Sequence, residues 1–293
     1  MNGLRRLVAN PWRQHRGLAV WTWLYLAWAI VPVVIAIAFS FNEGRSRSVW
    51  QGFSLKWWIG DPDLSLLHDP TLTSAIQQSL TLGILTMAIA TPIGVALALG
   101  LARWRGRGSG SANFIMLLPL VTPEIVFATG LFFTLIYLYP MPEIGTGAQL
   151  VGHVTWSIPY VVVVLRGRIF GVGPELEEAA MDLGAPPLEA LRRVLLPVLA
   201  PAIFAAFMIV FALSIDDFVT SQFLSRNEGT QTVPMLIYSS GRTAPNPSLN
   251  ATATLMLVIS LSAIAIAGIG MKRLAARQGA AGGGGNVAAD IRL

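Results

Sequence analysis

The segment EAAMDLGAPPLEALRRVLLP, residues 178–197, contains the clearest local signals in the chain and indicates two short helices joined by a turn. The first helix starts near Pro174, and the acidic side chains in its first turns suit the positive end of a helix dipole. These acids are Glu175, Glu177 and Glu178. Gly184 then provides the left-handed residue that ends many helices, and two prolines after it can open a second helix. A helical hairpin over residues 174–197 is therefore predicted.

The predicted hairpin carries both apolar and charged surface. Its apolar side chains are those of Ala179, Ala180, Leu183, Leu188, Leu191 and Val194. Arg192 and Arg193 form a charged edge. A short amphipathic hairpin of this kind is suited to docking on another protein, and the alternative is an ordinary helical hairpin closed by a glycine cap.

The hairpin resembles the EAA loop of the permease subunits of ATP-binding-cassette importers. The pattern of that loop is Glu-Ala-Ala, three residues, Gly, nine residues, a branched apolar residue, any residue and Leu-Pro, and Val194 stands where Ile is commoner. The resemblance implies that the loop is cytoplasmic and fits into a cleft of a separate ATPase subunit. The residues to which it assigns this coupling role are Glu178, Ala179, Ala180, Gly184, Leu188 and Pro197.

The composition is that of a membrane protein with several spans. The 293 residues are 54% hydrophobic and 12% charged, and the mean hydropathy is +0.62. The chain has no cysteine, which excludes disulfides, thiol nucleophiles and thiolate metal sites. His15, His68 and His153 are too scattered to indicate a metal cluster. The pI of about 10.1 reflects arginines beside apolar segments, so no nucleic-acid partner is expected.

Apolar runs of about 20 residues, long enough to cross a bilayer core of about 30 Å, predict the membrane spans. They lie at residues 18–41, 72–101, 114–139, 150–165, 198–218 and 249–271. The fourth is short, contains His153 and Pro159, and can also begin earlier, after Glu143. The predicted fold class is all-α: a polytopic membrane protein with six transmembrane helices and, by the resemblance above, the fold of a type I importer permease.

The basic residues indicate which ends of the spans face the cytoplasm. One side of the membrane holds 15 of the 20 lysines and arginines: Arg5, Arg6, Arg13, Arg16, Arg103, Arg105, Arg107, Arg166, Arg168, Arg192, Arg193, Lys272, Arg273, Arg277 and Arg292. This asymmetry predicts that both termini and the hairpin are cytoplasmic. The expected parts are a cytoplasmic segment 1–17, a permease domain 18–273 and a disordered, glycine-rich cytoplasmic tail 274–293. The first span is too long for the apolar region of a signal peptide, which favours an uncleaved anchor.

The connection over residues 42–71 is long and is predicted to lie outside the membrane. It carries three tryptophans, Trp50, Trp57 and Trp58. Two interpretations are open: a helix that lies along the outer leaflet, or an ordinary aromatic belt at the membrane interface.

No nucleotide-binding motif is present in the sequence. The run RGRGSGS at residues 105–111 lacks a following Lys-Ser or Lys-Thr, and neither Lys56 nor Lys272 ends a Gly-x-x-x-x-Gly-Lys motif. ATP and its magnesium ion are therefore expected on a partner ATPase, and this subunit is expected to need no cofactor and to be no enzyme.

Three acidic residues fall within or near the predicted spans, where ionisable groups are costly and mark functional sites. Glu124 lies about ten residues into the third span, near the membrane midplane, and Pro119 and Pro123 before it predict a kinked or broken helix. Asp216 and Asp217 lie toward the outer end of the fifth span, and successive helical residues point about 100° apart, so both cannot face one pore. Each acid is either part of the substrate pathway or structural.

Aromatic and small side chains complete the candidate pathway. Trp156, Tyr160, Phe218 and Phe223 either offer ring faces to a cation or simply pack between helices. The second span carries small residues that are expected to allow close helix contact: Thr91, Gly94, Ala96, Ala98 and Gly100.

The segment from Ala212 onward narrows the resemblance to the second permease of spermidine and putrescine importers, and this resemblance extends from the first span through Met271. The matching features are Asp-Asp-Phe at 216–218, Thr-Val-Pro at 232–234, Ile-Tyr at 237–238 and Pro-x-x-Asn-Ala at 247–251. This resemblance implies a polyamine importer in the bacterial inner membrane. Its expected partners are the lipid bilayer, a related permease, two ATPase subunits and an external substrate-binding protein.

Two other functions remain open. The cargo could be another small solute, such as an amino-acid derivative, an opine or iron. The chain could also be a membrane-embedded enzyme that uses Glu124 or the aspartate pair as acid and base. Against an enzyme, the sequence has no metal-binding helix motif, no nucleophile elbow and no histidine clustered with acids.

Overall fold

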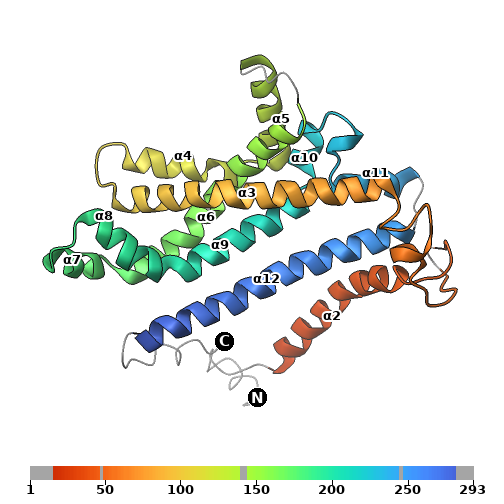
Figure 1. Cartoon of the computed structure of the whole chain (residues 1–293), viewed down its shortest axis with the longest axis horizontal. Helices are drawn as coiled ribbons and strands as arrows, with labels where there is room; N and C mark the ends of the chain where they lie inside the picture. The colour runs from red at the N-terminus through yellow and green to blue at the C-terminus, as the bar shows by residue number, and fades with distance from the viewer. Residues whose placement is uncertain (1–15, 47–48, 139–143, 244–246, 282–293) are drawn as a thin grey trace, which may run out of the picture. The chain divides into compact units, whose positions relative to one another are not determined.

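The computed structural model describes residues 16–46, 49–138, 144–243 and 247–281 (Figure 1). The chain forms two compact units: Met1–Asp69 with Pro245–Thr254, and Pro70–Ala244 with Leu255–Leu293. The regular structure of the described residues is helical, apart from one isolated bridge between Asn42 and Phe53. This agrees with the predicted all-α class.

The larger unit contains most of the helices. In chain order they are α3 (Pro70–Arg103), α4 (Ser109–Val121), α5 (Glu124–Phe133), η2 (Thr134–Leu138), α6 (Thr146–Val172), α7 (Glu175–Asp182), α8 (Pro187–Ala190), η3 (Leu191–Leu195), α9 (Leu196–Asp216), α10 (Val219–Leu224), η4 (Glu228–Thr230), α11 (Val233–Thr243) and most of α12 (Pro247–Ala281). Helices α3, α6 and α9 pack together, with α7 and α8 at one end and α10 at the other (Figure 1). The two candidate sites described below therefore lie at opposite ends of one bundle.

The bundle core is built from small residues on α3 against branched residues on α6 and α9. Ala90 and Ala98 are fully buried and pack with Val161, Leu165 and Val210. A Cβ atom added to Gly94 would lie 2.5 Å from the Cβ atom of Val161, so α3 and α6 approach closely there. The predicted close contact through small residues is confirmed at Gly94.

We expect Gly94→Ala to destabilise the protein, because the new methyl group must push α6 away from α3. Overpacking of this kind costs about 1–3 kcal/mol. Thermal unfolding of the detergent-purified protein measures the effect. Gly100→Ala is the matched control, because an added Cβ there meets nothing within 4 Å. Equal midpoints for the two variants would contradict the packing described here.

The third predicted span is broken, as its prolines indicate. Helix α4 ends at Val121, α5 begins at Glu124, and the two segments meet at a bend of 107°. Pro123 occupies the N-cap position of α5 with an extended backbone conformation. Because proline has no backbone N–H and restricts the residue before it, Thr122 is extended as well. The break leaves Glu124 as the first residue of α5.

The fourth and fifth spans are longer than the predicted ranges. Helix α6 begins at Thr146, which confirms the earlier start, and continues to Val172 beyond the predicted end at 165. The fifth span is a single helical stretch of 30 residues, Pro187–Asp216, that joins α8, η3 and α9. At 1.5 Å per residue it is about 45 Å long. The second arm of the hairpin is therefore continuous with a membrane-spanning helix.

The smaller unit contains α2 (Arg16–Phe39) and the connection that follows it. The indole N–H of the fully buried Trp57 donates to the Asn42 carbonyl at 2.6 Å, and Trp58 stacks on Phe41. The only helical element between α2 and α3 in the described residues is a single π-turn, η1 (Lys56–Gly60). In the described residues, the predicted interfacial helix is limited to this one turn. Trp57 is buried and Trp50 is 49% exposed, and the aromatic belt stays a prediction.

Five helices are long and apolar enough to cross a membrane, and the bent pair of α4 and α5 brings the number to six. This agrees with the six predicted spans. Helix α12 continues to Ala281, past the residue 273 at which the permease domain was predicted to end. The first part of the tail predicted to be disordered is therefore helical, and residues 282–293 lie outside the described ranges, as does most of the predicted segment 1–17.

Candidate functional site

The hairpin between α6 and α9 has the glycine cap that the sequence predicts. Gly184 has a φ of +90°, in the left-handed region. Its N–H donates to the Met181 carbonyl at 2.9 Å, and the Ala185 N–H donates to the Ala180 carbonyl at 3.0 Å. These two bonds form a Schellman motif, which ends α7 and turns the chain toward α8.

The tip of the hairpin exposes apolar side chains. Leu183 is 90% exposed and Leu188 is 60% exposed. Of the residues predicted to couple to an ATPase, Ala180 is half-buried and the others are exposed: Glu178, Ala179, Gly184, Leu188 and Pro197. An exposed apolar tip with an acidic rim is the kind of surface that binds another protein.

The base of the hairpin is tied to the end of α3. The guanidinium of Arg103 donates to both carboxylate oxygens of Glu177 in α7. Both side chains are partly exposed, so the pair contributes only about 0.2–1 kcal/mol to stability. The sequence marks Arg103 as a residue of the cytoplasmic side. It does not predict the pairing with Glu177, because the two residues are 74 positions apart in the chain.

At the opposite end of the bundle, α9 ends at the two aspartates. Asp217 has an extended backbone, and its side chain is 7% exposed, whereas Asp216 is exposed. The two carboxylates therefore do not share one face, as the sequence predicts. Asp217 accepts the backbone N–H of Ser221 at 2.8 Å, which links it to the first turn of α10.

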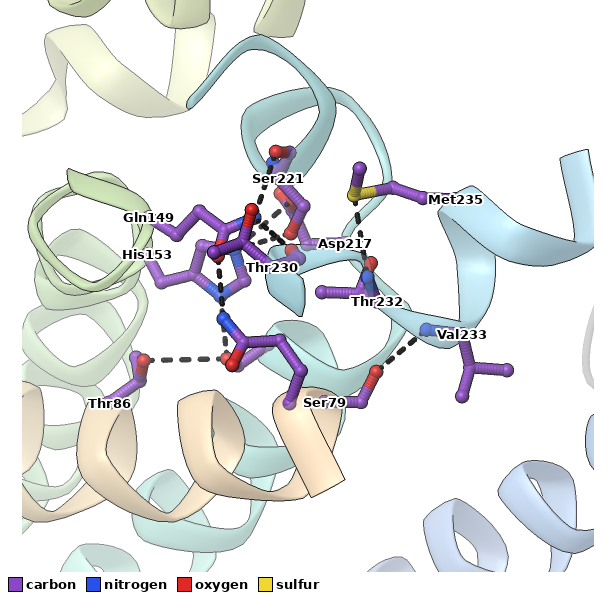
Figure 2. A network of polar contacts seen from close by, with 12 residues as sticks. Ser79, Thr86, Gln149, His153, Asp217, Ser221, Thr230, Thr232, Val233 and Met235 are labelled. Atoms are coloured by element: carbon purple, nitrogen blue, oxygen red, sulfur yellow. Dashed lines mark hydrogen bonds and ion pairs between the residues drawn. The ribbon is translucent and has the colours of Figure 1, made fainter. Parts of the chain in front are cut away.

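His153 of α6 lies at the centre of this end and is almost completely buried (Figure 2). Its Nδ1 atom is 2.7 Å from the Ser214 hydroxyl. Its Nε2 atom is 2.9 Å from the Ser221 hydroxyl and 3.3 Å from Oδ1 of Asp217. Sequence analysis missed this residue, because the serines and the aspartate lie far from it along the chain.

The structure brings Glu124 to the same place. Asp217 is the nearest acidic neighbour of Glu124, and His153 and Asp216 are further ionisable neighbours. Neighbouring carboxylates repel each other unless a proton or another cation lies between them. The break between α4 and α5 thus presents Glu124 to the buried Asp217.

Three of the four candidate aromatic residues make contacts with other rings. Trp156 lies one turn beyond His153 on α6, with its ring centroid 5.2 Å from that of Phe127 on α5. Tyr160 follows at 6.4 Å from Trp156. The Phe218 and Tyr238 ring centroids are 4.7 Å apart, and Phe223 is 37% exposed. Carboxyl groups and aromatic rings are the side chains that bind an ammonium group.

A polar network holds the surrounding helices (Figure 2). The side-chain amide of Gln149 donates to the backbone carbonyls of Ser221 and Thr230, and its oxygen accepts from Gln78 at 2.7 Å. Ser79 accepts the N–H of Val233 at 2.9 Å. Because these groups are buried and paired, they fix α3, α6 and the segment from 217 to 233 relative to one another. Within the described ranges, no group of three or more metal-binding side chains could hold an ion.

Comparison with known sequences gives consistent matches. A family model described as binding-protein-dependent transport system inner membrane component matches residues 90–278. The putrescine transport system permease protein PotI of Escherichia coli strain K12 is 37% identical over 264 residues, which cover 88% of this chain and 89% of that protein. The spermidine/putrescine transport system permease protein PotC of Shigella flexneri is 34% identical and covers 92% of this chain and 95% of its own.

Solved structures share the fold at low sequence identity. A subunit of a bacterial ABC transporter involved in the import of the acidic polysaccharide alginate superposes with a TM-score of 0.67 at 17% identity, covering 88% of this chain and 96% of that chain. A subunit of the MetNI methionine ABC transporter in an inward-facing conformation gives a TM-score of 0.59 at 16% identity, covering 70% and 96%. Both confirm the predicted importer permease fold.

Proposed function

The chain belongs to the family of binding-protein-dependent transport system inner membrane components, and we propose that it forms half of the translocation pathway of a polyamine importer. It is a multi-pass membrane permease rather than an enzyme. The closest chemical match to its buried site is a small alkyl chain with ammonium ends, of which putrescine and spermidine are examples.

The proximity of Glu124 to Asp217 carries the cargo proposal, because it puts two carboxyl groups beside the break between α9 and α10. An ammonium group placed between the two carboxyls would relieve their repulsion, and the ring of Trp156 would cover the neighbouring part of the ligand. The names of the relatives PotI and PotC support the same cargo, because they match nearly the whole chain.

The hairpin is the feature that supports the proposal of a partner ATPase on the cytoplasmic side. Its exposed tip would fit into the ATPase, which would bind ATP and magnesium. A second permease would complete the pathway. Two ATPase subunits would bind on the cytoplasmic side, and an external binding protein would bind at the opposite face. At that face, a cavity of about 510 Å³ lined by Thr146, Arg226 and Asn227 offers a polar surface for docking.

The continuous helix Pro187–Asp216 gives the coupling a direct route. Movement of the hairpin tip by the ATPases would shift α9 as one body, and the far end of α9 carries Asp217. The carboxyl pair would then close around the cargo in one state and separate in the other. A ligand that binds the two states differently shifts the population between them.

Reconstitution of the complete complex in proteoliposomes tests this function. Uptake of radiolabelled putrescine is expected only with the ATPase, ATP and the external binding protein all present. Uptake of an uncharged diol of the same length is the control for cargo charge. Putrescine uptake by the isolated chain without ATP, or equal uptake of the diol, would overturn the proposal.

A further inference from the structure

We propose that His153 is a positioning residue for cargo recognition: it holds the Asp217 carboxylate in the orientation in which that carboxylate receives an ammonium group. This inference deepens the proposed function and depends on it. Neither the family match nor the sequence assigns a role to this histidine.

The contacts of the His153 ring connect residues on both sides of the break between α9 and α10. Ser214 precedes the break, Ser221 follows it, and Asp217 lies within it. His153 reaches all three, and Ser214 in turn lies 3.4 Å from the Thr86 hydroxyl on α3. One buried ring therefore fixes the backbone on both sides of the aspartate.

The two nitrogens of the His153 ring have different hydrogen-bond roles: one donates and the other accepts. A carboxylate oxygen can only accept a hydrogen bond, so the nitrogen near Asp217, Nε2, must carry a hydrogen to stabilise it. In the neutral ring Nδ1 then accepts the hydroxyl hydrogen of Ser214. With Oδ1 held by His153 and by the Ser221 N–H, the orientation of the Asp217 carboxylate is set.

Two substitutions separate the hydrogen-bond roles of Nε2 and Nδ1. In His153→Gln the side-chain amide nitrogen can reach the position of Nε2 and still donate to Asp217. In His153→Asn the shorter amide reaches only the position of Nδ1. If His153 acts through Asp217, the KM for putrescine uptake rises about tenfold in His153→Asn and less than about threefold in His153→Gln, because a lost hydrogen bond to a charged group has that magnitude. Maximal uptake changes little in either.

A double-mutant cycle with Asp217→Asn completes the test in the reconstituted complex. We expect His153→Asn to cause no further rise in KM once Asp217→Asn is present. Ser79→Ala is the control, because it removes a bond of the same buried network, to Val233, that does not involve Asp217. It should leave KM unchanged.

Three results would overturn the role of His153. The first is that the effects of His153→Asn and Asp217→Asn on KM are additive. The second is that His153→Gln and His153→Asn have equal KM. The third is that both His153 variants fail to assemble into the complex, which would show that the ring serves packing alone. Failure of the wild-type complex to transport any polyamine would instead refute the proposed cargo. The two failures are therefore distinguishable.

Discussion

Replacing Leu183 by aspartate should reduce ATP-coupled uptake at least about 100-fold, because the partner ATPase would have to bury an unpaired charge at roughly 3–5 kcal/mol. Leu183 is 90% exposed, so the substitution should leave the fold of this subunit intact. Uptake by the complex and co-purification of the ATPase measure the effect.

Leu183→Met is the matched control for that substitution. It keeps an apolar side chain of similar volume, so both uptake and ATPase association should stay close to the wild-type values. Normal uptake by Leu183→Asp would show that the hairpin tip is not an ATPase-binding surface.

Removing the carboxyl of the buried Asp217 or of the half-buried Glu124 should have the second large effect. In Asp217→Asn and in Glu124→Gln, putrescine uptake at low substrate concentration is expected to fall about 10- to 100-fold, because each loses a charge-assisted contact to the ammonium group. The initial rate of uptake against putrescine concentration gives both KM and the maximal rate.

Asp216→Asn provides a control beside the site. Asp216 is the neighbour of Asp217 in the chain, but it is exposed whereas the Asp217 side chain is buried. Its neutralisation should change the KM for putrescine less than about threefold. Equal losses for the two aspartates would show that overall negative charge, and not the paired geometry, draws the cation.

Local signals were sufficient to predict most of the helices. Hydropathy located six spans, Pro119 and Pro123 indicated the break before Glu124, and Gly184 marked the end of the first hairpin helix. Each of these features depends on residues close together in the chain, which is why they can be read from one sequence. Family resemblance supplied the importer permease fold, which the comparisons confirm.

The length of the fifth helix was underestimated for a physical reason. Its predicted start at 198 follows the charged pair Arg192 and Arg193, where hydropathy falls. Helix formation does not require apolar residues, and both arginines are good helix formers. The backbone continues through them as the π-turn η3. The predicted range 198–218 therefore covered the apolar part of this helix and not its full length.

The centre of the buried site could not be predicted from the chain alone. Asp217 and Glu124 were candidates because acids at membrane depth are rare, but their proximity depends on how α5 packs against α10. His153 was discounted because the sequence has no histidine cluster. Its partners, Ser214, Asp217 and Ser221, are brought together only by the fold.

The position of the hairpin relative to the membrane and the ATPase can be measured directly by cysteine labelling. The chain has no native cysteine, so Leu183→Cys would carry a single reactive thiol, and Glu228→Cys would report the opposite end. A membrane-impermeant maleimide should label Leu183→Cys in inside-out vesicles and Glu228→Cys in right-side-out vesicles, and added ATPase should protect only Leu183→Cys. Labelling of Leu183→Cys from the outside, or no protection by the ATPase, would contradict the coupling proposed here.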